Sequence, residues 1–328
     1  LEYVANGLKL IKSNFGAKAI GALVSPHASL EELYLTGAFV RGLGSENIDY
    51  RLRQAEFDQP TGIRYLGLPI AALSTLQRVL VIGSNLRKDH PLFAQRIRQA
   101  ARAGCVVNAL TAEAVDWAMP VRNVLVSPAR DWVQALADIA FAVASEKGVA
   151  APVAGTATPA AKEIAASLLS GERKAILLGN AAAHHAKSTS LLSLANWIGE
   201  QVGASVGFLT EAANTVGAQV AGALPGQNGL NAGQMLAGGL KAAILFNNEP
   251  QFDSAAGVAS MNNLAQCEMV VTLSPFKANM EFSDVLLPIA PFTETPGTFV
   301  NAEGRMQSFH AVVKPLGETR PGWKVLRV

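Results

Sequence analysis

Eight short apolar runs of five or six residues recur along the chain of 328 residues, and longer amphipathic stretches separate them. Within most runs the apolar residues are consecutive rather than alternating with polar ones, which is typical of strands buried on both faces. Strands that alternate with helices predict an α/β fold with mostly parallel sheets flanked by helices. The expected strands are residues 20–25, 79–83, 105–110, 175–179, 205–209, 242–246, 268–273 and 284–289.

The stretches between these runs carry apolar residues at helical spacing, most clearly between residues 4 and 15, 92 and 101, and 191 and 202. Ser29 is followed by Leu30 and then by two glutamates, the pattern of a helix N-cap with an acidic first turn. These stretches are therefore expected to form the helices that cover the sheets.

Composition narrows the class of protein. Half of the residues are hydrophobic and 16% are charged, so the chain can bury a large core, and its length suggests two domains. A net charge of +2 leaves no electrostatic footprint for nucleic acid or an anionic membrane surface. The longest charge-free stretch, residues 212–240, is rich in Gly and Asn, so we expect a loop-rich segment and no membrane insertion.

The two cysteines, Cys105 and Cys267, are too few for a disulfide framework and form no Cys-x-x-Cys pair. They are expected to be buried or free thiols in a reducing compartment. The first residue is Leu1 rather than Met, and the last residues resemble the start of a helix. We therefore expect a piece of a longer polypeptide.

Common catalytic and metal signatures are absent, including the phosphate-binding loop and the H-E-x-x-H motif. His184 and His185 are adjacent, but neighbouring helix residues point about 100° apart and rarely bind one ion. Because no Cys or carboxylate stands near them in the sequence, we expect exposed histidines at a helix start.

Two of the expected strands end in turns that carry polar side chains. The carboxyl ends of parallel strands are where open α/β sheets bind ligands, and the following helix N-terminus suits a phosphate. These turns could hold two nucleotide moieties or could simply be turns. Their residues are Gly83, Ser84 and Asn85 after one strand, and Asn247, Asn248 and Glu249 after the other.

The densest pattern lies between residues 283 and 307, where a strand and a tight turn precede a polar cluster beside two glycines. Such a cluster can either satisfy buried backbone groups or bind a polar ligand. Its members are Glu294, Thr298, Asn301, Glu303 and Arg305.

Residues 283–307 resemble a hallmark of the molybdopterin oxidoreductase family, S-D-V-x-L-P followed by E-x-x-G-T-F-x-N-x-E-G-R-x-Q. Further matches to the family pattern lie in residues 79–98, 25–34 and 214–225, so the resemblance covers essentially the whole chain. It implies a molybdopterin-oxidoreductase-like α/β fold. Residues 1–62 plus 210–328 would form one discontinuous α/β subdomain, and residues 63–209 an inserted Rossmann-like subdomain.

Within this family, residues 47–54 are similar to the corresponding segment of the large iron–sulfur subunit (G chain) of respiratory complex I. The resemblance places Ala55 at the position of the metal ligand, and a methyl group cannot coordinate a metal. Asn108 begins a stretch that lacks the D-P-R of molybdenum enzymes, and Leu86 replaces the Pro of the family turn. The resemblance thus implies a lost cofactor site with no catalytic, metal-binding or cofactor-binding residues. The iron–sulfur clusters are expected in the part of the parent chain that precedes this region.

The resemblance also implies a role. The parent would be proton-pumping NADH:quinone oxidoreductase, and this region would be a non-catalytic scaffold that contacts other subunits of the hydrophilic arm. That arm lies on the cytoplasmic side of a bacterial inner membrane. The alternative is a catalytic molybdenum or tungsten bis-pterin oxidoreductase that acts on formate or a small oxyanion. A third possibility is a vestigial pocket that still binds a nucleotide. Glu294 and Arg305 are expected to be mainly architectural.

Overall fold

The computed structural model describes residues 1–58 and 62–327 and confirms the α/β class, with parallel sheets flanked by helices. The chain divides into two compact units. Unit 1 comprises Leu1–Gln54 and Ala212–Val328, and unit 2 comprises Ala55–Glu211. The sequence analysis expected the same nested arrangement, with the two boundaries after residues 62 and 209.

The sheet of unit 2 has the order β5-β4-β3-β6-β7, and every neighbouring pair is parallel. The chain starts in the central strand β3, extends the sheet on one side through β4 and β5, and then returns to add β6 and β7 on the other. This is the doubly wound topology of nucleotide-binding folds. The strands are β3 (Arg78–Ile82), β4 (Val106–Thr111), β5 (Asn123–Val126), β6 (Lys174–Leu178) and β7 (Ser205–Phe208).

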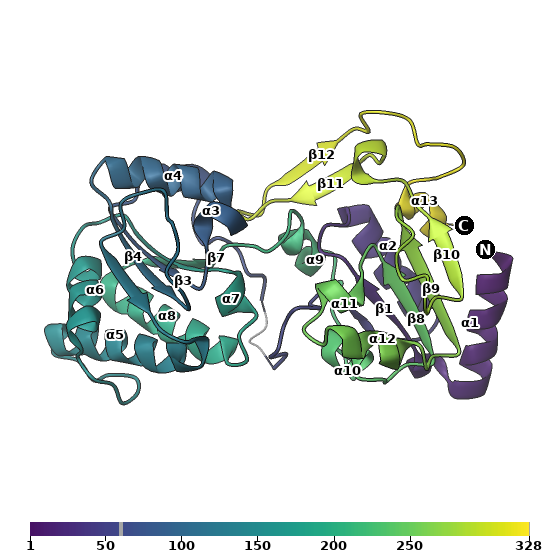
Figure 1. Ribbon diagram of the computed structural model, residues 1–328, viewed down its shortest axis with the longest axis horizontal. Coiled ribbons are helices and arrows are strands. Elements are labelled where there is room, and N and C mark those ends of the chain that lie inside the picture. Colours follow the sequence, from purple (N-terminus) through teal and green to yellow (C-terminus); the bar gives the residue numbers. More distant parts are fainter. Residues whose placement is uncertain (59–61, 328) are drawn as a thin grey trace. The chain divides into compact units, whose positions relative to one another are not determined.

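Helices cover both faces of this sheet (Figure 1). On one face lies α4 (Pro91–Arg102), preceded by the short α3 (Leu86–Asp89). On the other face α5 (Trp132–Lys147), α6 (Pro159–Leu169) and α8 (Ser188–Val202) enclose one apolar core with the strands, and Trp132 is its largest fully buried side chain. The remaining helix of the unit, α7 (Asn180–Ala183), follows β6 directly.

The sheet of unit 1 has the order β10-β9-β8-β1-β2 and is also parallel. Its centre joins the two separate segments of the unit, because Ile20 of β1 pairs with Ala242 of β8 and the register continues to Val24 and Phe246. The strands are β1 (Ile20–Val24), β2 (Ile48–Asp49), β8 (Ala242–Phe246), β9 (Met269–Ser274) and β10 (Val285–Pro288).

One face of this sheet packs against α1 (Glu2–Phe15) and α2 (Leu30–Gly42), with Leu8 and Leu33 in the shared core. The expected cap at Ser29 is confirmed, since Ser29 and Glu32 form a reciprocal capping box at the start of α2. The other helices of the unit are α9 (Thr215–Val220), α10 (Ala232–Leu236), α11 (Pro250–Asp253), α12 (Val258–Leu264) and α13 (Gly322–Leu326).

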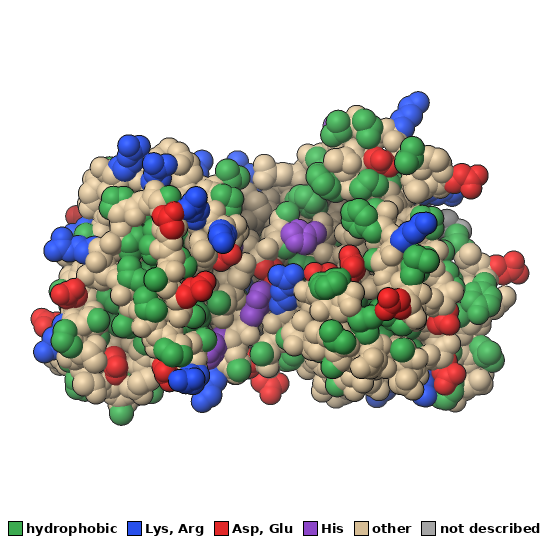
Figure 2. Space-filling view, in the orientation of Figure 1, with side chains coloured by type: hydrophobic (Ala, Val, Ile, Leu, Met, Phe, Trp, Pro, Cys, Tyr) green, Lys and Arg blue, Asp and Glu red, His purple; other side chains and the backbone are tan. Residues whose placement is uncertain are grey.

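Strands β11 (Gly297–Val300) and β12 (Met306–Phe309) of unit 1 form an antiparallel hairpin, which is a separate two-stranded sheet. The sequence signal predicted a strand and a turn in this region but not the hairpin. Hydrophobic side chains gather over the hairpin and the segment after it in Figure 2. Val312 and Leu316, which follow the hairpin in the chain, are exposed. On the face that is drawn, positive and negative side chains are interspersed. No helix among the described residues is long and apolar enough to cross a membrane.

Gly207 in β7 offers a test of the unit 2 fold. The segment before β3 runs along this edge strand, and the backbone N–H of Phe208 donates to the carbonyl of Tyr65 at 2.8 Å. A Cβ atom on Gly207 would overlap the carbonyl of Leu66, and backbone cannot give way cheaply. Gly207→Ala is therefore expected to lower the free energy of unfolding by about 3 kcal/mol in urea titrations.

Gly42 is the matched control, because a Cβ there meets nothing within 4 Å and the residue ends helix α2. Gly42→Ala should leave the free energy of unfolding unchanged or raise it slightly, since Ala favours helix. Equal effects of the two substitutions would contradict the close approach at Gly207.

Candidate functional site

The turn after β3 carries the three candidates of unit 2. Gly83 has a φ of 65°, and a Cβ on it would lie 2.7 Å from both the backbone nitrogen of Ala182 and the Trp132 ring. Ser84 is buried. Asn85 precedes α3, and its backbone N–H donates to Asp89 Oδ2 at 2.9 Å. All three residues are thus engaged by their own unit.

The crevice between the carboxyl ends of β3 and β6 is where a doubly wound sheet receives a phosphate. Here Gly179 and Ala181 fill it with backbone, because their N–H groups donate to the carbonyls of Ile82 at 2.8 Å and Gly83 at 3.0 Å. A Cβ on Gly179 would overlap the side chain of Ser84. This close packing leaves no room for a phosphate between the two strand ends.

Sequence reasoning missed a buried histidine beside Ser84. His90 Nε2 lies 3.1 Å from the carbonyl of Thr210, and a carbonyl can only accept, so we assign the proton of the neutral ring to Nε2. Nδ1 is then left without a proton and faces the Ser84 hydroxyl 3.2 Å away, which also lies within 3.3 Å of its acceptor Asp89 Oδ2. Burial lowers the pKa of His90, while the Thr210 carbonyl and the Asp89 charge oppose that shift. Both Ser84 and His90 are buried, so this pair fastens the chain and presents no nucleophile.

The expectation of exposed His184 without a carboxylate neighbour is wrong. His184 Nε2 lies 2.7 Å from Glu211 Oε2, and both side chains are largely covered. The two residues follow β6 and β7, which are adjacent parallel strands, so the sheet brings together residues that the sequence separates. His185 instead contacts the carbonyl of Ala129 through Nε2 at 2.9 Å. The two rings thus contact different partners.

The candidates of unit 1 follow β8. Asn247 has a φ of 52°, and its N–H donates to the carbonyl of Leu273. Asn248 is buried and donates from Nδ2 to the carbonyl of Leu23 at 2.7 Å. Glu249 precedes α11, and its N–H donates to Asp253 Oδ2 at 2.8 Å. These groups close the strand end onto the neighbouring strands and helix.

A cavity of about 460 Å³ opens at the carboxyl edge of the unit 1 sheet. Phe246, Phe276 and Phe292 contribute to an aromatic wall, Glu32 is its carboxylate, and neither Lys nor Arg lines it. Burial raises the pKa of Glu32, although hydrogen bonds from Ser29 oppose the rise. An apolar wall with a carboxylate and no cation does not suit a pyrophosphate.

The segment at the expected metal position lies at the start of unit 2. Ala55 is exposed and offers only a methyl group. Glu56, the next residue, is engaged elsewhere, since its Oε2 accepts from the Ser188 hydroxyl at 3.0 Å and the Thr189 N–H at 2.7 Å. Its carboxylate therefore caps the N-terminus of α8, where a negative charge is stabilised.

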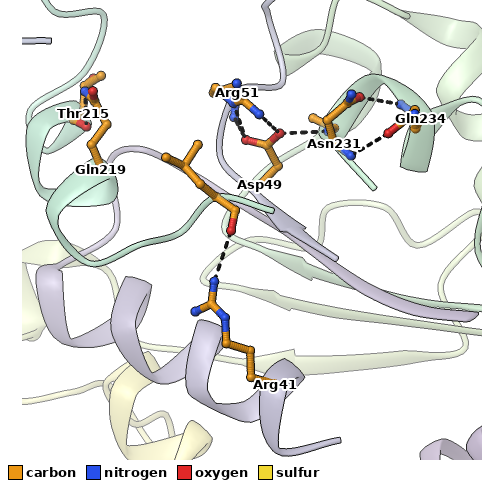
Figure 3. A network of polar contacts seen from close by, with 9 residues as sticks. Arg41, Asp49, Arg51, Thr215, Gln219, Asn231 and Gln234 are labelled. Carbon is orange, nitrogen blue, oxygen red and sulfur yellow. Dashed lines mark hydrogen bonds and ion pairs between the residues drawn. The ribbon is translucent and has the colours of Figure 1, made fainter. Parts of the chain in front are cut away.

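The residues just before Ala55 form a polar network in unit 1 (Figure 3). Asp49 is fully buried and accepts two hydrogen bonds from Arg51, each at 2.9 Å. Asp49 Oδ2 also accepts from the N–H of Ala232 at 3.0 Å, so it holds the first turn of α10. Asn47 accepts from the N–H of Leu230 at 2.7 Å. Both motif residues thus fasten the glycine-rich 212–240 segment to the sheet edge.

The motif cluster near the C-terminus also binds backbone. Thr298 N–H donates to Glu31 Oε2 at 3.0 Å, and Asn301 Oδ1 accepts from the N–H of Arg305 at 2.9 Å within the hairpin turn. Glu294 accepts from the N–H of Leu316 at 2.9 Å. The Arg305 side chain is 71% exposed beside Glu303, and an exposed ion pair contributes little to the free energy of unfolding.

The two cysteines lie away from the edges of the sheets where ligands bind. Cys105 and Cys267 precede β4 and β9, so both lie at the amino ends of their strands, away from the edge where ligands bind. Burial raises the pKa of each thiol to about 11, against the weaker influence of Arg78 and Lys241 respectively. Within the described part of the chain, no three His, Cys, Asp or Glu side chains could hold a metal ion. Ala55 therefore offers no side-chain ligand at the position where the family resemblance places one.

The chain matches the family model of molybdopterin oxidoreductases over residues 1–328 and belongs to that family. A chain of the formyltransferase/hydrolase complex from Methylorubrum extorquens, solved with methylofuran, has the same fold. The two superpose with a TM-score of 0.64 at 17% identity, covering 99% of this chain and 94% of the other.

Curated relatives match at two scales. The alpha subunit of a Geobacter sulfurreducens NADPH-Fe(3+) oxidoreductase is 23% identical over 392 aligned positions, which cover 98% of this chain and 46% of that subunit. Two others are 48% identical over 46 residues, or 14% of this chain. They are a formate dehydrogenase-like protein of Staphylococcus aureus, of which 5% is covered, and the mitochondrial 78 kDa subunit of Candida albicans NADH-ubiquinone oxidoreductase, of which 6% is covered. The aligned region thus spans about half the length of these curated relatives or less.

Two aspartate–arginine pairs of unit 1 give a matched test of the network. Asp49→Asn removes the charge that faces the largely buried Arg51 and should lower the free energy of unfolding by about 3 kcal/mol. Asp253→Asn breaks the exposed pair with Arg53 and should cost less than about 1 kcal/mol. Urea titration of both variants checks the difference. Equal losses would show that Asp49 does not fasten the loop.

The two cysteines give a pH-dependent test. Because the thiolate reacts and burial raises both pKa values to about 11, the folded protein at about pH 8 should hold roughly 100-fold less thiolate than a thiol of pKa 9.0. Iodoacetamide labelling should therefore be slow in buffer, fast in concentrated guanidinium chloride, and faster in buffer as the pH rises toward 11. Rapid labelling of the folded chain at about pH 8 would contradict the burial of the thiols.

Proposed function

We propose that this chain is the molybdopterin-oxidoreductase-like region of a large iron–sulfur subunit like that of complex I, and that the region is a scaffold. The observation that carries the proposal is the donor set. The expected ligand position holds the exposed methyl of Ala55, and the two thiols lie at the opposite edges of the sheets. A family member without metal donors keeps the fold for a reason other than catalysis at that site.

The motif residues support a structural role. Asn47 and Asp49 accept hydrogen bonds from backbone N–H groups of the 229–232 loop. Asn214 also binds backbone groups. Its side chain donates to the carbonyl of Ala28 at 2.7 Å and accepts from the N–H of Val300 at 2.8 Å. Such contacts stabilise the unit whether or not a cofactor is bound.

The comparisons support the parent class. The 78 kDa subunit of an NADH-ubiquinone oxidoreductase matches a short stretch, and the alpha subunit of an NADPH-Fe(3+) oxidoreductase matches nearly the whole chain. Both names describe oxidoreductases that take electrons from a nicotinamide cofactor. In this proposal, iron–sulfur clusters in another part of the parent chain carry the electrons to quinone.

The remaining expectations belong to the same proposal. The scaffold would pack against other subunits of the hydrophilic arm on the cytoplasmic side of a bacterial inner membrane. Its exposed apolar side chains after the hairpin, Val312 and Leu316, suit contacts with such neighbours. No nucleic acid partner is proposed, because the net charge is only +2.

A catalytic subunit acting on formate or a small oxyanion is the second candidate. The observation that favours it is the 48% identity over 46 residues with a formate dehydrogenase-like protein. Ala55 argues against this candidate, because its methyl group cannot coordinate a metal.

A deletion strain separates the two candidates. In the organism that encodes the chain, we expect deletion to abolish NADH:quinone reductase activity of the membranes and to leave formate:viologen reductase activity unchanged. A plasmid copy should restore the lost activity, and a copy carrying Asp253→Asn serves as a variant that should fold. Loss of formate oxidation with intact NADH:quinone activity would overturn the scaffold proposal in favour of the enzyme.

A further inference from the structure

A polar cavity of about 370 Å³ lies at the amino edge of the unit 2 sheet, on the face covered by α6. Arg78 at the start of β3 and Arg122 just before β5 both line it. Ser167 in the last turn of α6 and Ser170, the residue that caps this helix, also line it. The parallel register fixes this grouping, since β4 lies between β3 and β5 and begins at the cavity with Val106.

The two guanidinium groups have no carboxylate partner among the described residues. Arg78 is oriented, because its Nε donates to the Ser170 hydroxyl at 2.8 Å and its Nη1 donates to the carbonyl of Gln77 at 2.6 Å, which leaves Nη2 outside these two bonds. Arg122 is exposed, with its backbone N–H bound to the carbonyl of Val107 at 2.9 Å. Glu163 is the one carboxylate of the lining, so positive charge prevails.

A third donor follows from the hydrogen-bond order beneath the cavity. Asn123 Nδ2 donates to Asn108 Oδ1 at 2.8 Å, and Asn108 Nδ2 donates in turn to the Ser167 hydroxyl oxygen at 3.1 Å. Asn108 Nδ2 also donates to the carbonyl of Val79 at 3.1 Å, and a carbonyl can only accept, so this chain is fixed in direction. The Ser167 oxygen accepts, so its own proton is left to donate toward the cavity.

The positive charge around the cavity also affects the pKa of the neighbouring Lys174. Lys174 pairs in register with Arg78 on the adjacent strand β6. Its pKa is lowered, first by burial and then by repulsion from Arg78 and Lys147. A bound anion would relieve this repulsion between cations.

From these contacts we propose that the cavity is a binding site for a phosphoryl group, either free phosphate or the phosphate of a small ester. The Nη2 group of Arg78, the guanidinium of Arg122 and one hydroxyl match the oxygens of a tetrahedral dianion. The site lies at the amino edge of its sheet, opposite the edge where this class of fold binds nucleotides, and it is independent of the proposed scaffold role.

Calorimetric titration of the whole 328-residue chain tests the proposal, with inorganic phosphate and glycerol 3-phosphate as the probes and sodium chloride at matched ionic strength as the reference. We expect heat of binding with at least one probe, and the probe that binds identifies the source as free or esterified. Arg122→Gln should weaken that binding by about fivefold or more, because it removes a charge-assisted contact without disturbing a buried group.

The matched control is Arg98→Gln, which removes one exposed positive charge from α4 on the other face of the same sheet. It should leave the dissociation constant unchanged. The proposal fails if neither probe binds beyond the chloride reference. It also fails if Arg98→Gln weakens binding as much as Arg122→Gln, since the effect would then be one of net charge alone. Circular dichroism of both variants checks that they are folded.

Discussion

The parallel pairing of β1 with β8 is the interaction on which the rest of unit 1 depends. It joins Ile20–Val24 from the first segment to Ala242–Phe246 from the second, with the whole of unit 2 between them in the chain. Such distant pairing costs loop-closure entropy before it gains any contact. Both strands are fully buried, so burial of their apolar side chains on two faces offsets that cost.

Polar side chains complete what the strand pairing begins. Arg41 of α2 donates to the carbonyls of Gly222 and Leu224, and Asp49 accepts from the N–H of Ala232 in the same long segment. Asn214, within that segment, donates from its side chain to the carbonyl of Ala28. Each of these contacts links the first part of the chain to the second. A glycine-rich segment loses much conformational entropy when it becomes ordered. Hydrogen bonds from the buried polar side chains offset that loss and fix the segment in one conformation.

Much of the fold could be predicted because buried parallel strands leave a strong signal. All eight expected strands are present, from β1 to β10. Two strands of the parallel sheets, β2 and β5, were not predicted, and each has a physical reason. β5 is an edge strand with alternating exposure, so Val124 and Val126 face solvent, and β2 has only two residues. The hairpin was missed because its motif was interpreted as one strand followed by a polar cluster.

The candidate site was less predictable, because its contacts depend on topology. His184 meets Glu211 only since β6 and β7 are neighbours, and the buried pair of Ser84 and His90 requires the turn after β3 to fold back. The positions of Gly83, Asn85 and Asn247 at strand ends followed from the sequence. What occupies the space beside them did not, since close packing of Gly179 against Ser84 is a property of the assembled sheet.

We propose that this family member keeps the fold and has lost the side chain that would bind the metal at residue 55. The most direct measurement is native mass spectrometry of the chain purified from a host that makes pterin cofactors and is supplied with molybdate and tungstate, combined with elemental analysis. The account predicts the mass of the polypeptide alone, 34.3 kDa, and molybdenum and tungsten far below one atom per chain. A larger native mass with one molybdenum or tungsten atom and released pterin per chain would contradict it.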